Sequence, residues 1–251
     1  MKKILIITIL FSLYLALSAQ SAADIVDRAD QIFLQNKLYQ KSTMTIVRRG
    51  KKQAVQLLES YFQKEGARNK SLTLFLEPRR VKGTAYLSIG DDLWVRFAST
   101  GRIRKMSSSA KKNSAGGSDF SYSDMGEGND GYAAKYMLSL EGEEKLDGLN
   151  CYRILMKPRP GSSDIYEKAV AFISKSDYSY RKIELYEDGA HIKTMTFDDY
   201  RPLGDGLYPY LMKMESHARN SYSLIETLEM EVDSSRVQDR FFSKSYLEAI
   251  R

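Results

Sequence analysis

The chain is poor in the residues that most often carry catalysis or cross-links. Among 251 residues it has one cysteine, Cys151, and two histidines, His191 and His217. A single cysteine excludes an intramolecular disulfide, so the core alone must hold the fold together. Cys151 lies in the strand-like run CYRILMK and is expected to be a small buried apolar residue. Neither histidine has a metal-ligand partner at a useful spacing, and both are expected to be structural or surface side chains.

The common motifs of enzymes are missing as well. The sequence has no G-x-S-x-G elbow, no P-loop and no H-E-x-x-H. Residues 126–131, GEGNDG, fit G-x-G-x-x-G, but they follow a polar loop instead of a strand, and their acids would repel a pyrophosphate. Four acids in this region lack EF-hand spacing, so a solvated loop is favoured over a cation site. These acids are Asp119, Asp124, Glu127 and Asp130. We therefore predict no enzyme, no metal and no cofactor.

The N-terminus has the three-part layout of a secretory signal peptide. Lys2 and Lys3 precede an apolar run over residues 4–17, and small residues follow. The run is shorter than the roughly 20 residues of a membrane span, although an uncleaved anchor is the alternative. Cleavage is expected after Ser21 or Ala23. Residues 1–23 are then the leader, and residues 24–251 form a single exported domain in the periplasm. The formal charge of +6 is mild and does not call for nucleic acid.

The rest of the sequence predicts a mainly β protein with a few helices. Residues 24–39 have apolar side chains at helical spacing, with Asp24 as the candidate cap. Short β-branched and aromatic runs bounded by turn residues follow, which favours a large curved antiparallel sheet. The expected strands are residues 42–47, 53–63, 71–76, 84–89, 93–97, 103–106, 135–140, 151–157, 167–173, 180–187, 191–197, 210–216 and 223–232. The tail 238–250 is expected to form a turn and a short helix.

Methionine is abundant, with 10 residues, and six of these lie in the predicted strands of the second half of the chain. Ordinary core filling explains any one of them. A concave sheet lined by methionine and aromatic side chains is also suited to flexible acyl chains. The six are Met137, Met156, Met195, Met212, Met214 and Met230.

One polar loop carries aromatic side chains two residues apart. It reads GGSDFSYSD over residues 116–124 and interrupts the succession of strands. Together with K-G-T at 82–84 and D-G-x-x-C-Y at 147–152, it resembles the outer-membrane lipoprotein-sorting family, the LolA-like proteins. The similarity covers most of the chain after the leader and includes PRRVKGTAYL (78–87), the region 91–125, EEKLDGLNCYRILMKPRPG (143–161) and HIKTMTFDDYR (191–201).

The resemblance implies a half-open β-barrel over the N-terminal helix and a lid segment. It also implies a monomeric carrier of lipid or lipoprotein acyl chains, with an inner-membrane transporter as a possible partner. A non-transport envelope module that binds a membrane protein, and a lipid-ester hydrolase, are the alternatives. The hydrolase would require Ser or Asp paired with a histidine inside the cavity.

The resemblance and the predicted strands together indicate candidate ligand-binding residues. Trp94 and Phe97 differ by an odd number, so only one of the two can face the cavity, and Trp94 is our prediction. Asp119 and Asp124 are expected at the rim, facing solvent or the basic residues Arg102, Arg104, Lys111 and Lys112. Further cavity or lid candidates are Leu74, Leu76, Met195, Phe120 and Tyr122, with Gly116 and Gly117 as the lid hinge. If Phe120 is instead a static core residue, its truncation should cost stability.

Overall fold

The computed structural model describes residues 20–33, 36–65, 68–126, 131–161, 164–204 and 206–250. Its strands are β1 Lys37–Arg48, β2 Lys51–Glu65, β3 Arg68–Glu77, β4 Ala85–Ile89, β5 Asp92–Arg96, β6 Ile103–Lys105, β7 Tyr136–Leu146, β8 Leu149–Pro158, β9 Lys168–Ser174, β10 Tyr180–Glu187, β11 Ala190–Leu203, β12 Gly206–Ser216 and β13 Ser221–Val232. Its helices are α1 Ala22–Phe33, α2 Ser108–Lys111, α3 Tyr122–Gly126, α4 Tyr132–Lys135, the 3₁₀ helix η1 Asp239–Phe241 and α5 Lys244–Ala249.

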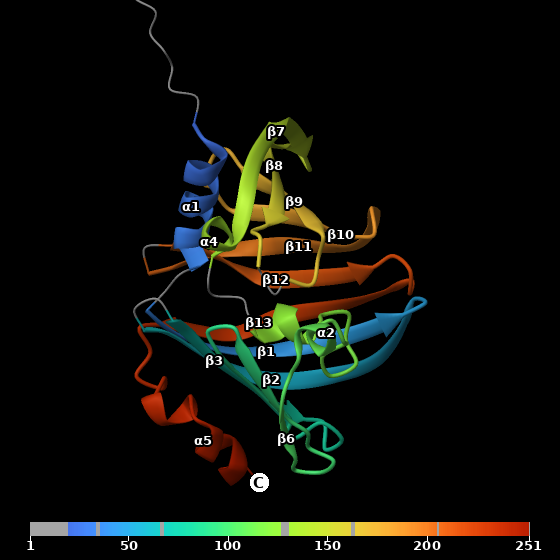
Figure 1. Ribbon diagram of the computed structural model, residues 1–251, viewed down its shortest axis with the longest axis vertical. Helices are drawn as coiled ribbons and strands as arrows, with labels where there is room; N and C mark the ends of the chain where they lie inside the picture. The colour runs from blue at the N-terminus through green and yellow to red at the C-terminus, as the bar shows by residue number, and fades with distance from the viewer. Residues whose placement is uncertain are drawn as a thin grey trace, which may run out of the picture.

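The strands form one open, curved antiparallel sheet of thirteen strands, in the order β6-β5-β4-β3-β2-β1-β13-β12-β11-β10-β9-β8-β7 (Figure 1). Each half of the sheet is a meander in which strands adjacent in sequence pair with one another. The first and last strands, β1 and β13, pair along almost their whole length and join the two halves. Each of the thirteen runs expected from the sequence corresponds to one of these strands, which confirms the mainly β fold.

The N-terminal helix is shorter than the sequence pattern predicts. It ends at Phe33, and Leu38 and Tyr39 already belong to β1, where both are buried. The start is also different, because Ser21 is the capping residue. Its hydroxyl accepts from the Asp24 amide at 3.1 Å, and the Ser21 amide donates to the Asp24 carboxylate at 3.2 Å, so the two form a capping box. Among the described residues, no helix is long and apolar enough to cross a membrane.

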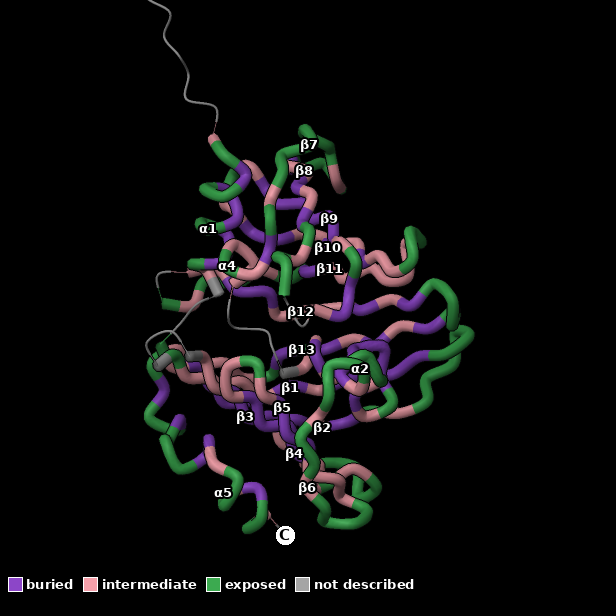
Figure 2. The backbone as a smooth tube through the Cα atoms, in the orientation of Figure 1, coloured by how far each residue is buried: buried purple, intermediate pink, exposed green. Residues whose placement is uncertain are grey.

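Both faces of the sheet are covered, at different places (Figure 2). We call the face that carries the largest core cluster the inner face. Helix α1 packs on it against β7, β9 and β12. Strand β5 shows the alternation clearly, because Leu93 and Val95 point to the inner cluster whereas Trp94 points to the opposite, outer face. The same strand therefore has no solvated face.

The C-terminal segment covers the outer face beside β3, β4 and β5. Leu247 of α5 is fully buried there, and Phe241 of η1 lies edge-on to Tyr61 with ring centroids 4.7 Å apart. The Arg96 guanidinium donates to the Ile250 carbonyl at 2.6 Å and holds the end of the segment on the sheet. The turn and short helix expected for the tail are thus confirmed, and they bury a second apolar cluster.

The burial of Leu247 under this segment predicts that its truncation destabilises the protein more than truncation of the exposed Leu228. Leu247→Ala should destabilise the protein by about 2–5 kcal/mol, because it leaves a cavity under α5. Leu228→Ala is the matched control, since Leu228 is 58% exposed on β13, and its effect should stay within about 0.5 kcal/mol. Urea unfolding of both variants measures the difference, and equal stabilities would show that the C-terminal segment contributes nothing to the core.

Candidate functional site

The connection between β6 and β7 determines where the candidate site lies. These strands are the two edges of the sheet, so the chain must pass from one edge to the other. Residues 107–135 join the two strands, and we call them the covering segment. Their described parts, 107–126 and 131–135, carry α2, α3 and α4 and lie over the inner face (Figure 1). Its residues 127–130, and with them Glu127, Asp130 and most of the GEGNDG motif, lie outside the described residues.

Asp119 anchors the covering segment to β13. Its carboxylate is only 2% exposed and accepts from the hydroxyls of Ser221 at 2.6 Å and Ser223 at 2.8 Å. The Arg219 guanidinium lies 3.0 Å from the same carboxylate. A buried carboxylate is stable only when paired and hydrogen-bonded in this way. The expectation that Asp119 faces solvent is therefore wrong, and its cationic partner comes from a distant turn.

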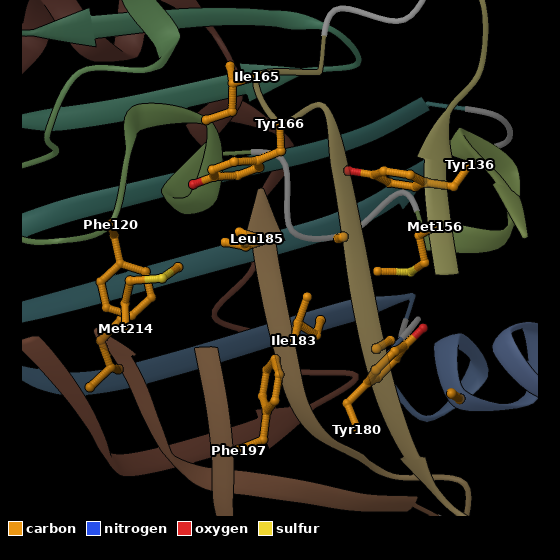
Figure 3. Packing of buried hydrophobic residues seen from close by; sticks show 14 of the residues in the cluster. Phe120, Tyr136, Met156, Ile165, Tyr166, Tyr180, Ile183, Leu185, Phe197 and Met214 are labelled. Carbon is orange, nitrogen blue, oxygen red and sulfur yellow. The ribbon is translucent and has the colours of Figure 1, made fainter. Parts of the chain in front are cut away.

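Phe120 follows this anchor and points into the main core cluster, where it is 3% exposed (Figure 3). Tyr122 begins α3 and packs edge-on against Tyr86, with ring centroids 5.4 Å apart. Tyr86 in turn lies edge-on to Phe75 at 5.1 Å. The aromatic residues of GGSDFSYSD thus attach the covering segment to β3 and β4, since aromatic edge-to-face pairs add to the area they bury.

Asp124 is the polar centre of the site. It closes a capping box at the start of α3, because its carboxylate accepts from the Ser121 amide at 2.7 Å while the Asp124 amide donates to the Ser121 hydroxyl at 3.0 Å. The Tyr166 hydroxyl donates to the same carboxylate at 3.0 Å, and the Lys193 ammonium lies 3.6 Å away. The cation that neutralises Asp124 is therefore on β11, and none of the four basic residues near it in sequence has this role. Of these four, Lys111 and Lys112 bind elsewhere, to the Asp91 carbonyl and to Glu187.

Two cavities flank α3. The first, which we call the tyrosine cavity, has a volume of about 180 Å³ and lies between α3, α4 and strands β10 and β11. The second, the methionine cavity, has a volume of about 160 Å³ and lies between α3 and strands β1, β2, β12 and β13. Asp124 borders both, so α3 and its cap form the wall between them. The rings and thioethers that name the cavities are Tyr132, Tyr136, Tyr166 and Tyr180 in the first, and Met125, Met212 and Met230 in the second.

The volumes limit what each cavity can hold. An apolar cavity of about 150 Å³ accommodates a molecule the size of benzene. Each cavity therefore holds a short apolar group while α3 is in place, and a long acyl chain requires the space of both. The wall of the methionine cavity includes Leu58, Phe62 and Ile225.

Asp30 is a titratable residue in the wall of the tyrosine cavity. Burial raises the pKa of its carboxyl to about 6, while hydrogen bonds from the Ala133 amide at 2.8 Å and the Tyr180 hydroxyl at 2.9 Å act in the opposite direction. Burial and the nearby carboxylates raise the pKa of Tyr132 and Tyr136 as well, so both phenols stay protonated. The cavity therefore presents hydroxyl donors next to carboxylate acceptors.

Two of the residues predicted to line the cavity lie on the other side of the sheet. Trp94 belongs to the outer cluster, between the ammonium groups of Lys105 and Lys244, which lie 5.5 and 4.9 Å from its ring. Leu74 packs in the same cluster, whereas Leu76 lies at a shift in the pairing of β2 with β3 and borders neither of the two cavities. The prediction for Trp94 is corrected, because the C-terminal segment makes the outer face apolar too. Phe97, the alternative, packs against the inner cluster.

The remaining predicted residues lie on the inner face or in the covering segment. Met195 borders the tyrosine cavity, and Phe120 borders the methionine cavity. Gly117 has open space around it, but a Cβ on Gly116 would lie 2.9 Å from the Phe75 ring and 3.0 Å from the Gln56 amide oxygen. The positive φ of 58° at Gly116 also favours glycine. Gly116 thus permits close packing, and this geometry does not support a hinge at that position.

Sequence reasoning missed most of the tyrosine cavity. Tyr166 lies between strands, in a loop without periodicity, so no pattern points to it. Tyr180 and Asp30 are 150 residues apart and meet only in the fold. The methionine cavity was easier to predict from the sequence, since Met212 and Met230 lie in predicted strands. Of the tyrosine cavity, the sequence pattern indicated only the β11 wall, where alternation places Met195 and Phe197 on one face.

The two histidines meet away from these cavities. His191 and His217 have ring centroids 4.4 Å apart, and both bind the Thr194 hydroxyl. Neither borders the tyrosine or the methionine cavity. Within the described ranges, no three histidine, cysteine or acidic side chains are grouped as metal ligands. Cys151 is a free, fully buried thiol, as expected, and burial raises its pKa.

Solved structures share this architecture. A DUF1329 family protein from Desulfovibrio piger is 25% identical, with a TM-score of 0.83 over 90% of this chain and 97% of that chain. A putative outer membrane lipoprotein-sorting protein domain from Vibrio parahaemolyticus is 24% identical, with a TM-score of 0.81 over 90% and 98%. A LolA superfamily protein from Nitrosomonas europaea is 21% identical, with a TM-score of 0.74 over 90% and 99%. The fold is therefore LolA-like.

The sequence places the chain in a family within this class. A family model with the description "Uncharacterized protein" matches residues 67–249, more than two thirds of the chain. The chain belongs to this LolA-like family, which confirms the resemblance seen in the sequence. A search of curated proteins gave no match.

The burial of Phe120 predicts the behaviour of its truncation. Phe120→Ala should lower the free energy of unfolding by about 3–5 kcal/mol, because the ring is packed among core residues and not at a rim. Thermal and urea unfolding measure this loss. A loss below about 1 kcal/mol, together with altered release of a bound fatty acid, would instead make Phe120 a movable lid.

The raised pKa of Asp30 predicts a pH dependence of stability. The folded protein binds the Asp30 proton more tightly than the unfolded chain does, so stability falls as the pH rises from about 4 to about 6. Asp30→Asn removes this proton equilibrium while keeping an acceptor for the Ala133 amide. Between pH 4 and pH 7, wild type should lose about 3 kcal/mol more than the variant in urea unfolding. Parallel pH profiles of the two proteins would contradict the assignment.

Proposed function

We propose that this protein is an exported, monomeric carrier that binds acyl chains of lipids or lipoproteins against the inner face of its sheet and moves them between envelope membranes. The observation that carries the proposal is the pair of cavities beside α3, on the concave side of an open sheet. Methionine, leucine and phenylalanine side chains make up about half of the residues that line the methionine cavity. Such flexible and apolar walls suit a ligand without fixed shape.

The position of α3 fits this proposal. A long acyl chain exceeds either cavity alone, and the two are separated only by α3 and the Asp124 cap. We propose that the chain occupies the methionine cavity first and that displacement of α3 opens the way to the tyrosine cavity. The tyrosine hydroxyls and carboxylates there suit the more polar part of an amphiphile. The similarity to structures described as lipoprotein-sorting and LolA superfamily proteins supports a carrier in the periplasm.

A partner is expected to deliver or receive the cargo, and an inner-membrane transporter is the proposed class.

The second candidate function is a non-transport envelope module that binds a membrane protein. It is favoured by the small volume of each cavity and by the exposure of Val55 on β2 and Leu228 on β13, at 40% and 58%, on the two strands that flank β1. Neither histidine borders the tyrosine or the methionine cavity, so neither cavity has the pairing that the hydrolase would require.

A charge in the methionine cavity tests the carrier function. Met212→Asp should abolish binding of a fluorescent fatty acid, because a carboxylate without a partner is costly in an apolar wall. Leu228→Asp is the matched control on the outer face and should bind normally. Titration of the fluorescent fatty acid measures both affinities.

Since Met212→Asp itself risks a loss of folding, Met212→Trp provides a second variant that fills the cavity with an apolar ring. It should weaken binding at least tenfold while circular dichroism stays that of wild type. Native mass spectrometry of protein from its host membrane fraction identifies the cargo. Normal binding by a folded Met212→Trp, with no co-purifying lipid in wild type, would favour the envelope module.

A further inference from the structure

The turns at the two ends of the strands differ in charge. At one end, the turn between β1 and β2 reads Arg48-Arg49-Gly50-Lys51-Lys52, four basic residues in five, all exposed. At the opposite end, the described turns carry acids, with Asp91 between β4 and β5 and Asp147 between β7 and β8. The +6 charge of the whole chain is therefore distributed unevenly over the sheet. We call the first end, residues 48–52 with the neighbouring turn 217–220, the basic end.

The pairing of β1 with β13 fixes these two turns side by side. Arg48 is the register partner of Ser221, and the Arg49 amide donates to the Asn220 carbonyl at 3.0 Å (Figure 1). Arg219 of the second turn adds a guanidinium that is 44% exposed. Antiparallel geometry thus gathers five cations from two turns on one tip of the molecule.

Three acidic side chains toward this end of the sheet are paired with cations, while Asp188, in the turn between β10 and β11 at the same end, is exposed. Asp119 is buried and paired with Arg219, Glu215 is paired with Lys213, and Glu187 with Lys112. In the described part of the chain, the side-chain cations of Arg49, Lys51 and Lys52 form no ion pair. Long, exposed and unpaired cations of this kind have no structural partner to satisfy, so their charge is available to a partner outside the molecule.

We propose that the basic end is a docking surface for an anionic lipid bilayer. The cations lie in two exposed turns and border neither the tyrosine nor the methionine cavity, which suits several lipid headgroups better than one bound phosphate. Each basic residue near an anionic bilayer strengthens binding by roughly fivefold, so the four cations of residues 48–52 give appreciable affinity without apolar insertion. A carrier and an envelope module would both use such a surface, so the inference does not depend on the proposed function.

Two of these cations also hold the covering segment, which places that segment beside the docked bilayer. The Arg48 guanidinium donates to the Gly117 carbonyl at 2.9 Å, and Arg219 pairs with Asp119. We therefore leave Arg48 and Arg219 unchanged in the test and neutralise Lys51 and Lys52, which have exposed side chains and no role in the core.

The test is sedimentation of the whole protein with lipid vesicles. Phosphatidylcholine vesicles containing about one third phosphatidylglycerol should bind wild type, and binding should vanish near 1 M salt because the charges are screened. The double variant Lys51→Gln/Lys52→Gln should bind about thirtyfold more weakly. Lys64→Gln/Lys145→Gln is the matched control, since it removes two exposed charges at the opposite end, and it should bind like wild type.

Three outcomes would overturn the proposal. These are equal binding to vesicles of pure phosphatidylcholine, equal losses in the two double variants, and tighter binding to duplex DNA than to the anionic vesicles at the same salt. Unfolding curves of both double variants confirm that the fold is unchanged. Fatty-acid binding by the same variants separates this test from that of the carrier function, because the methionine cavity lies away from both lysines.

Discussion

The structure depends on one constraint of topology: the chain leaves the sheet at one edge, β6, and re-enters it at the other, β7. Thirteen strands about 4.8 Å apart would separate these edges by roughly 58 Å in a flat sheet. Curvature shortens the path, and the connection crosses the inner face. The residues that fill the concave side are therefore the same residues that join the two halves of the sheet, so the interior cannot be emptied without moving a covalent connection.

The hydrogen bonds and the ion pair of Asp119 hold that connection on the sheet. A carboxylate that is 2% exposed, with two hydroxyl donors and a guanidinium, is strongly disfavoured if any partner is lost. It places Phe120 in the core and the start of α3 next to Tyr86. The covering segment is thus a packed element with a polar anchor at one side and an aromatic one at the other. The two cavities exist because α3 is too short to fill the inner face.

The sequence predicted the strands well, because short β-branched runs between turn residues are a local signal. Which side chains point to the inner face, and which to the outer face, was predicted less well. Alternation showed correctly that Trp94 and Phe97 point in opposite directions, but both faces of β5 are apolar, and the choice between them depends on α5, some 150 residues away. The same limit explains Asp119, since its partner Arg219 is a hundred residues distant. The tyrosine cavity combines residues from three helices, a loop and three strands, which no local pattern connects.

The Asp119 anchor of the covering segment and the basic end lie at the same tip of the molecule. A bilayer that contacts this tip would therefore act on the contacts that hold the covering segment. Arg48 and Arg219 each have one contact with the covering segment, and Arg219 also donates to the Ser216 hydroxyl at 3.2 Å. Anionic headgroups at that tip would compete for both guanidinium groups with the Gly117 carbonyl and the Asp119 carboxylate, because all are oxygen acceptors. A segment held by these contacts is more stable in water than against an anionic bilayer. Exchange of cargo at the bilayer, and retention away from it, would then follow from the placement of two arginines.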